Sequence, residues 1–248
     1  MFNDKQVFGM TGPSVFSPEI QVMIEKFFGG IPMYIGQNNV ADLEFPLAHL
    51  DALVLAGGND IFPGSYGQQV THGNSFSKFD ILRDKRELFL VKRCVELGKP
   101  ILAICRGFQL VCVNYGFHLM PDINGGSIVH SPGEIKIDLE SGGFMHYINT
   151  VKGENSFGLA PDKRYKVNSF HHQAVFAGNK ADWLENQGLK ILATSDTEIH
   201  EKNNTKIAEL AEHPEHKIVA CQWHPEADWE YGNHASTRVL TRFKQILG

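Results

Sequence analysis

An alternation of short apolar runs with segments of helical periodicity constrains the fold of this chain most strongly. Residues 6–10, 31–35, 52–55 and 101–104 have the length and apolar character of strands, and residues 18–28, 80–97 and 107–113 have helical periodicity. Strands that alternate with helices form mostly parallel sheets covered by helices on both faces. The sequence therefore predicts an α/β fold with a central, mostly parallel sheet.

The second half of the chain has a different pattern. Residues 167–175, 190–194, 207–210 and 218–222 are short, strand-like runs separated by Gly, Asn and Asp, and residues 235–247 have the pattern of an amphipathic helix. We interpret these strands as a small antiparallel addition to one side of the parallel sheet. Because the chain has no internal repeat and no linker-like stretch, we expect residues 1–248 to form one domain.

Composition excludes several classes of protein. The chain has 248 residues, a net charge of −5 and no basic runs, so no nucleic-acid partner is expected. Its four cysteines lack metal-ligand spacing, which favours a reducing compartment over a disulfide scaffold. No apolar run approaches the roughly 20 residues of a membrane helix. We therefore expect a cytoplasmic protein that does not bind a membrane.

A cysteine stands where the apolar run 101–104 meets the next helical segment. Cys105 follows the run directly, and Gly107 lies two residues later. This pattern is typical of a nucleophile elbow, in which a tight turn lifts the nucleophile above the sheet and a small neighbour gives clearance. The positive end of the following helix would stabilise the thiolate. A buried core cysteine is the alternative explanation of the pattern taken alone.

A histidine follows the last strand-like run. His224 and Glu226 are separated by Pro225, and the carboxylate has the reach to bond the imidazole nitrogen that faces away from the sulfur. Such a bond would fix the tautomer and stabilise the imidazolium, as the third member of a catalytic triad does. A His-Pro turn at the surface is the alternative.

Paired glycines follow the run 52–55. Gly57 and Gly58 would allow backbone N–H groups to approach a ligand closely. We assign the N–H groups of Gly58 and Arg106 to an oxyanion hole, the donors that a carbonyl under attack requires. An ordinary glycine turn is the alternative.

The remaining histidines do not indicate a metal site. His171 and His172 lack a third ligand at diagnostic spacing, and residues 213–216 form a polar stretch that we expect to be solvated. The spacing of His224 and Glu226 is similar to part of a zinc deaminase signature, but the Pro-Cys-x-x-Cys partner is absent. Since the chain also lacks a phosphate-binding glycine motif, we predict no metal and no cofactor.

The order Gly-Gly, Cys-x-Gly-x-Gln and His-Pro-Glu resembles the signature of the class I glutamine amidotransferase-like superfamily. Cys105-Arg106-Gly107-Phe108-Gln109 is similar to the γ-glutamyl-γ-aminobutyrate hydrolase branch, grouped with the C26 cysteine peptidases. Residues 57–67, 80–87, 167–173 and 221–226 resemble further stretches of that branch. The resemblance implies a flavodoxin-like sheet and covers nearly the whole chain.

What the resemblance implies for the site is specific. Cys105, His224 and Glu226 would form a triad that hydrolyses γ-glutamyl amides, small-molecule substrates, through a glutamyl thioester. Gln109 would hold the glutamyl end. The substrate carboxylate would contact a loop made of Ser169, Phe170, His171 and His172. The pocket for the amine would lie on the variable loops 62–77, 125–143 and 228–234.

Departures from the branch leave the amine and the partners open. Cys112, Phe117, Pro121 and Ala227 stand where the branch usually has other residues, so the resemblance does not name the amine. Two alternatives remain: a glutaminase subunit that supplies ammonia to a separate synthetase, and a non-catalytic binding protein on the same fold. The sequence also leaves open whether the chain forms a homo-oligomer.

Overall fold

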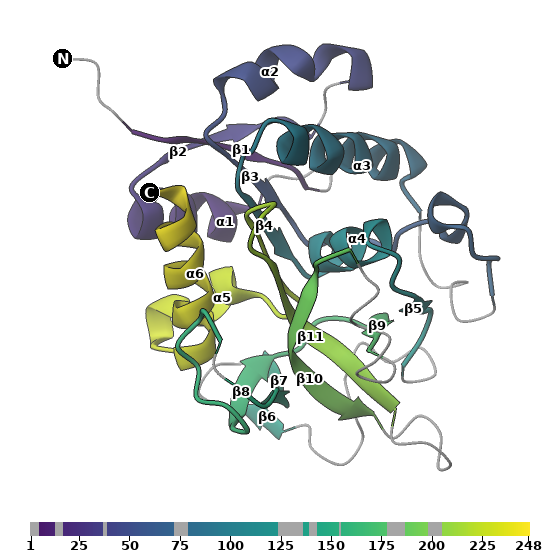
Figure 1. The fold of residues 1–248 in the computed structure, drawn as a ribbon, viewed down its shortest axis with the longest axis vertical. Coiled ribbons are helices and arrows are strands. Elements are labelled where there is room, and N and C mark those ends of the chain that lie inside the picture. The colour runs from purple at the N-terminus through teal and green to yellow at the C-terminus, as the bar shows by residue number, and fades with distance from the viewer. Residues whose placement is uncertain are drawn as a thin grey trace.

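The computed structural model describes residues 5–12, 17–36, 39–71, 79–123, 136–138, 143–153, 155–177, 187–197 and 205–248. One mixed 12-stranded sheet organises them, with its main path in the order β2-β1-β3-β4-β12-β11-β10-β7-β6 (Figure 1). Its parallel part consists of β2 (Ile31–Tyr34), β1 (Val7–Met10), β3 (Ala52–Leu55), β4 (Ile101–Ile104) and β12 (Ile218–Cys221). Its antiparallel part consists of β5 (Leu119–Met120), β6 (Lys136–Asp138), β7 (Gly143–Thr150), β8 (Arg164–Asn168), β9 (Ala174–Phe176), β10 (Lys190–Thr197) and β11 (Thr205–His213).

Helices cover both faces of the parallel part (Figure 1). One face carries α2 (Glu44–His49), α3 (Ile81–Glu96) and α4 (Arg106–Asn114); the other carries α1 (Pro18–Val22), which continues as a π-helix (Met23–Phe28), and α6 (His234–Leu247). Short turns of helix complete the chain: Val40–Asp42, Pro63–Tyr66, α5 (Pro225–Asp228) and Trp229–Tyr231. The predicted α/β class with helices on both faces is confirmed, but the sheet is mixed and not mostly parallel.

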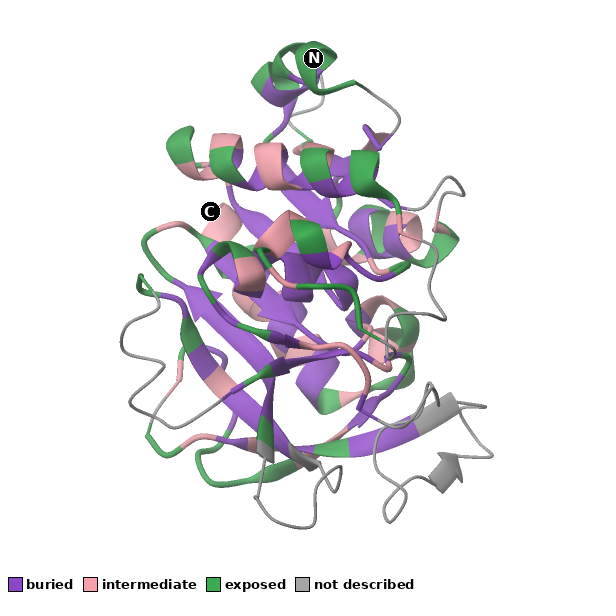
Figure 2. Cartoon of the chain, turned by 90° about the vertical axis from the view of Figure 1, so that its right-hand side faces the viewer, coloured by how far each residue is buried: buried purple, intermediate pink, exposed green. Residues whose placement is uncertain are grey.

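Alternation along the strands builds two cores. Leu53 and Leu55 of β3 pack with α3 and α4, whereas Ala52 and Val54 pack with α1 and α6. This is the period-two pattern of a strand that is buried on both faces. Figure 2 shows the result, with buried strands at the centre and exposed residues on the outer sides of the helices. None of the described helices is both long enough and apolar enough to cross a bilayer.

Local sequence determines where the helices begin and end. The side chain of Asp80 accepts the N–H of Arg83 at the start of α3, and Asn233 does the same for Ser236 at the start of α6. Gly29 ends the π-helix in the left-handed conformation, as its position predicts. Ser17 has the extended backbone of an N-cap, but its hydroxyl donates to Glu19 at 3.0 Å instead.

The structure corrects four expectations for the second half of the chain. The antiparallel part is not small, because β6 and β7 extend it and β10 and β11 are longer than predicted. Strand β12 is not part of it, since β12 pairs in parallel with β4. The run 167–175 is two strands, β8 and β9, separated by a loop. His213 is not solvated: it is 3% exposed at the end of β11.

Candidate functional site

Cys105 lies in a sharp turn between β4 and α4. Its φ of 52° and ψ of −104° put a non-glycine residue in a sparsely populated region, at a cost of about 1–3 kcal/mol that is typical of functional turns. Gly107 makes the turn sterically feasible, because a Cβ there would lie 2.5 Å from the carbonyl oxygen of Leu55. The cysteine thus has the elbow geometry that its sequence context predicts.

His224 reaches the same edge of the sheet from the neighbouring strand. Strands β4 and β12 pair in parallel, and the N–H of Cys105 donates to the carbonyl of Cys221 at 2.9 Å. The imidazole Nδ1 of His224 lies 2.7 Å from Glu226 Oε1. Since a carboxylate accepts, Nδ1 carries the proton in this bond and Nε2 is left for the cysteine.

Charge around His224 favours its imidazolium form. Burial alone would lower the pKa of this histidine. The charges of Glu226 and Cys105, and hydrogen bonds with both, outweigh burial and raise the His224 pKa well above its usual value. The arrangement therefore suits an imidazolium between a carboxylate and a thiolate.

Asn168 holds the backbone of His224 on two sides, a role that sequence reasoning missed. Its Oδ1 accepts the N–H of His224 at 2.8 Å, and its Nδ2 donates to the carbonyl of His224 at 2.7 Å. The same Nδ2 also donates to Asp228 at 3.0 Å. A buried Asn at the end of a strand is the signal that could have suggested this contact, because an amide can satisfy both backbone groups.

Gly57 lies against the cysteine and the histidine, and Gly58 lies against Arg83. A Cβ on Gly57 would meet the Cε1 atom of His224 at 2.7 Å and Cβ of Cys105 at 3.6 Å. Gly58 has a φ of 143°, which an L side chain rarely adopts. Arg106 is the first residue of α4, so its N–H has no partner within the helix. Of the two residues predicted to form an oxyanion hole, Arg106 follows Cys105 directly, and Gly58 lines the same cavity as His224.

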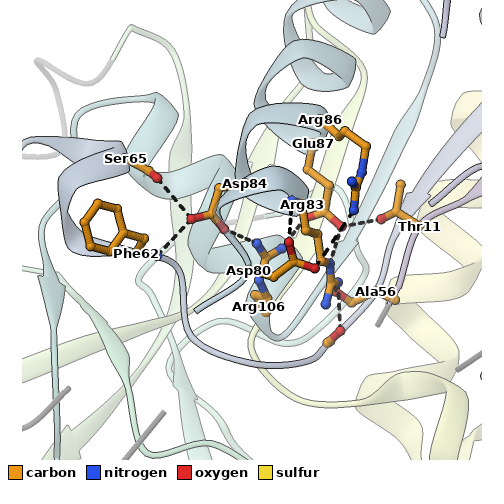
Figure 3. A network of polar contacts seen from close by, with 11 residues as sticks. Thr11, Ala56, Phe62, Ser65, Asp80, Arg83, Asp84, Arg86, Glu87 and Arg106 are labelled. Carbon is orange, nitrogen blue, oxygen red and sulfur yellow. Dashed lines mark hydrogen bonds and ion pairs between the residues drawn. The ribbon is translucent and has the colours of Figure 1, made fainter. Parts of the chain in front are cut away.

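A buried ion cluster behind the site links these two residues (Figure 3). The Glu87 carboxylate accepts from Arg83 at 2.8 Å, from Thr11 at 2.6 Å and from Arg106. Arg106 also pairs with Asp84, and the four charged side chains are at most 3% exposed. Burial alone would raise the Glu87 pKa, but Arg106 and Arg83 outweigh it and hold this pKa below its usual value.

The cluster reaches the glycine pair through Arg83. Its Nη2 donates to the carbonyl oxygens of Ala56 and Gly57, both at 2.9 Å. Glu87 thus ties the backbone around Gly58 to the N-terminus of α4 through two arginines. Sequence comparison of residues 80–87 pointed to this helix, but only the fold brings it behind Cys105.

The residues predicted to bind the glutamyl end are separated by the structure. Phe170 is 46% exposed, and its ring meets that of His224 edge-on with centroids 5.7 Å apart. Gln109 is buried and donates to the carbonyl of Gln173 and to Gln222. His172 bonds Asp60 at 3.0 Å, and this hydrogen bond raises the His172 pKa. Of these three, Phe170 contacts His224 through its side chain, whereas Gln109 reaches Cys105 only through its backbone N–H, which donates to the carbonyl of Cys105 at 3.0 Å.

Ser169 and His171 lie deeper, and the second of them joins a group that has the composition of a metal site. Ser169 is fully buried. Within the described residues, ligand atoms of His146, His171 and Glu209 lie within 4.8 Å of one another. His146 contacts Glu209 at 3.2 Å, and His171 Nδ1 bonds the carbonyl of Gln173. Spacing in the sequence showed no further ligand for His171, whereas the fold places His146 and Glu209 beside it.

A cavity of about 340 Å³ opens beside His224, which is large enough for a small ligand. Its walls come from four places in the chain: Ser17, Glu19 and Ile20 of the α1 region, Ala56 with the glycine pair, Phe170, and His224, Glu226 and Ala227. The expected amine-side loops do not form it in the described residues. Residues 72–77, 125–135 and 139–142 of those loops lie outside the described part of the chain.

Comparison with known proteins identifies the class of fold and then the family. The chain superimposes on a glutamine amidotransferase from Thermotoga maritima with a TM-score of 0.60 and 16% identity, covering 99% of each chain. The peptidase C26 family model matches residues 3–226. The chain therefore belongs to the peptidase C26 family of glutamine amidotransferase-like proteins.

Two relatives show how far the similarity extends. The glutamine amidotransferase-like protein YvdE of Lactococcus lactis is 34% identical over 186 residues, which are 74% of this chain and 69% of YvdE. The CTP synthase of Streptococcus sanguinis is 28% identical over 71% of this chain, but that match covers only 32% of the synthase.

The first prediction concerns thiol reactivity. We expect brief alkylation at neutral pH to modify Cys105 about tenfold faster or more than the other cysteines, because thiolates are the reactive form. Burial raises the pKa of Cys94 to about 12 and the pKa of Cys112 and Cys221 well above the usual value. Peptide mapping by mass spectrometry measures the order of modification. Earlier labelling of Cys94 or Cys112 would contradict the prediction.

The second prediction concerns pH. Glu226→Gln removes the charge that does most to raise the His224 pKa, so the imidazole should lose its proton at lower pH than in the wild type. NMR titration of the His224 ring measures this directly. The control is Glu230→Gln, which breaks an exposed pair with Lys26 and should leave the titration unchanged. An unshifted titration in Glu226→Gln would contradict the assignment.

The third prediction concerns the ion cluster. Glu87→Gln leaves two buried guanidinium groups short of one negative charge, so the free energy of unfolding should fall by about 3 kcal/mol. Glu96→Gln on the same helix removes a 42% exposed partner of Arg93 and should cost less than about 1 kcal/mol. Denaturant unfolding compares the two variants. Equal losses would show that the buried cluster does not contribute the larger share.

Proposed function

We propose that this protein hydrolyses γ-glutamyl amide bonds, with Cys105 as the nucleophile, His224 as its acid–base partner and Glu226 orienting that histidine. The observation that carries the proposal is the 2.7 Å contact of His224 Nδ1 with Glu226, at the sheet edge where Cys105 occupies a strained elbow. This combination suits an activated thiol better than a structural one. Membership in the peptidase C26 family supports the same class of chemistry.

In the first half-reaction, the Cys105 thiolate attacks the γ-carbonyl carbon of the substrate. The carbonyl oxygen becomes an oxyanion, which the N–H groups of Gly58 and Arg106 would stabilise. His224 then gives its proton to the leaving nitrogen, the C–N bond breaks and a free amine departs. The glutamyl group remains on the sulfur as a thioester.

In the second half-reaction, neutral His224 takes a proton from water, and the resulting hydroxide attacks the thioester carbon. The C–S bond breaks, glutamate is released and Cys105 leaves as the thiolate beside an imidazolium. Glu226 would stabilise the imidazolium of His224 before the thiolate attacks and again when the thioester is hydrolysed. Every group that these steps require is supplied by the chain itself.

A second candidate is a glutaminase that delivers ammonia to a synthetase. The similarity to CTP synthase from Streptococcus sanguinis favours it. The match covers 71% of this chain but only 32% of the synthase, as expected if this chain corresponds to one part of such an enzyme. Both candidates use the same nucleophile, so they differ in the substrate and in the need for a partner. A non-catalytic binding protein is the third alternative, and the intact Cys105, His224 and Glu226 argue against it.

The fourth prediction tests the nucleophile. Cys105→Ala should lower glutamate release by a factor on the order of 10³ or more, because no thioester can form. Cys112→Ala is the matched control, since Cys112 lies on the helix after the elbow and is buried in the core. Circular dichroism and thermal unfolding verify that both variants fold. A folded Cys105→Ala protein with wild-type turnover would reject the mechanism.

The fifth prediction separates the first two candidates. Purified protein alone should cleave γ-glutamyl amides of small amines with higher kcat/KM than glutamine, because contacts to the amine can stabilise the transition state. Released glutamate is the readout. Glutamine as the best substrate, or activity only after another protein is added, would favour the glutaminase subunit.

A further inference from the structure

The cavity beside His224 is positioned to receive the leaving amine of the proposed reaction. His224 gives its proton to the leaving nitrogen, so the amine departs on the side of the imidazole. The cavity begins there, since Gly57, Gly58 and His224 all line it. Its volume of about 340 Å³ suits a chain of a few carbons.

An acidic side chain lines this cavity from α1. Glu19 is exposed, and the Ser17 hydroxyl donates to its Oε2 at 3.0 Å. The other carboxylate of the lining, Glu226, is engaged by the imidazole of His224 at 2.7 Å. Of the two carboxylates among the described residues that line the cavity, Glu19 is therefore the one outside the triad that a ligand can reach.

Positive charge in the cavity is already matched. Among the described residues that line it, none is Lys or Arg. The nearest guanidinium, that of Arg83, lies behind Gly58, is 3% exposed and bonds Glu87. The imidazole of His224 is already paired with the Glu226 carboxylate at 2.7 Å. A negative group on the amine would thus find no unmatched cation among the described lining residues.

An aromatic side chain also lines the cavity. Phe170 lines the cavity, is 46% exposed and stands edge-on to His224. Aromatic faces bind alkyl chains by burial and attract ammonium groups through the ring quadrupole. Phe170 and Glu19 together present the features that recognise an alkylammonium group.

We propose that the amine released by this enzyme carries a second, cationic amino group, so that the substrate is a mono-γ-glutamyl diamine. The inference rests on the proposed hydrolysis. The alkyl chain lies along Phe170 and the distal ammonium pairs with Glu19. An amine that ends in a carboxylate, such as γ-aminobutyrate, is repelled by the same side chain.

The experiment compares three substrates of similar length with purified protein alone. These are the mono-γ-glutamyl amides of 1,4-diaminobutane, butylamine and 4-aminobutyrate, whose far ends are cationic, neutral and anionic. We expect kcat/KM to fall in that order, by about fivefold at each step, as is usual for a partly exposed charge pair. Added salt should reduce the differences.

Variants assign the preference to Glu19. Glu19→Gln should bring the three kcat/KM values within about twofold, and Glu19→Lys should reverse their order. Glu25→Gln is the matched control, because Glu25 is exposed on the same helical segment and bonds Gln21 outside the cavity lining. It should keep the wild-type order.

The outcomes separate this inference from the function on which it rests. Hydrolysis of all three amides at equal rates, or an order that Glu19→Lys does not change, would overturn the diamine preference and leave γ-glutamyl hydrolysis standing. A preference for the 4-aminobutyrate amide would also overturn it. No glutamate from any amide or from glutamine would reject the proposed function and the inference together.

Discussion

The parallel pairing of β4 with β12 is the interaction on which the site depends. The carboxyl ends of parallel strands lie at one edge of a sheet, which is where α/β proteins place their ligands. Here that rule brings Cys105, at the end of β4, beside His224, which follows β12. The two residues are more than a hundred positions apart in the sequence, and the backbone bond from Cys105 to Cys221 fixes their separation.

Electrostatics on opposite sides of the elbow serve different purposes. Behind it, Glu87 and Asp84 neutralise Arg83 and Arg106 in a cluster closed to water, and this cluster holds the backbone on either side of Cys105. In front of it, Glu226 bonds His224 and raises the pKa of that histidine, whose side chain is 20% exposed. Buried pairs of the first kind fix geometry, because removal of one member leaves a charge unpaired. The pair in front is suited to proton transfer.

The elements that surround the elbow differ in what they contribute. The sheet and α4 carry Cys105 and His224, the proposed nucleophile and its proposed acid–base partner. The cavity for the departing amine is lined instead by α1 and by the loop between β8 and β9, through Glu19 and Phe170. Loops and short helices at the edge of a rigid sheet vary without disturbing the core. Specificity in this protein is therefore expected to reside in residues that the family signature does not contain.

The sequence by itself determined the parallel strands β1–β4, the helices α3, α4 and α6, and the identity of the candidate triad. Local physics sufficed for these features, because apolar runs, helix caps and the Cys-x-Gly turn are encoded within a few residues. Only the tertiary structure decided that β12 belongs to the parallel part of the sheet, that residues 169–173 leave the sheet, and that Asn168 holds His224. It also decided that Glu19 lines the cavity and that His146 and Glu209 join His171. These features depend on contacts between distant segments, and neither spacing nor periodicity along the chain specifies such contacts.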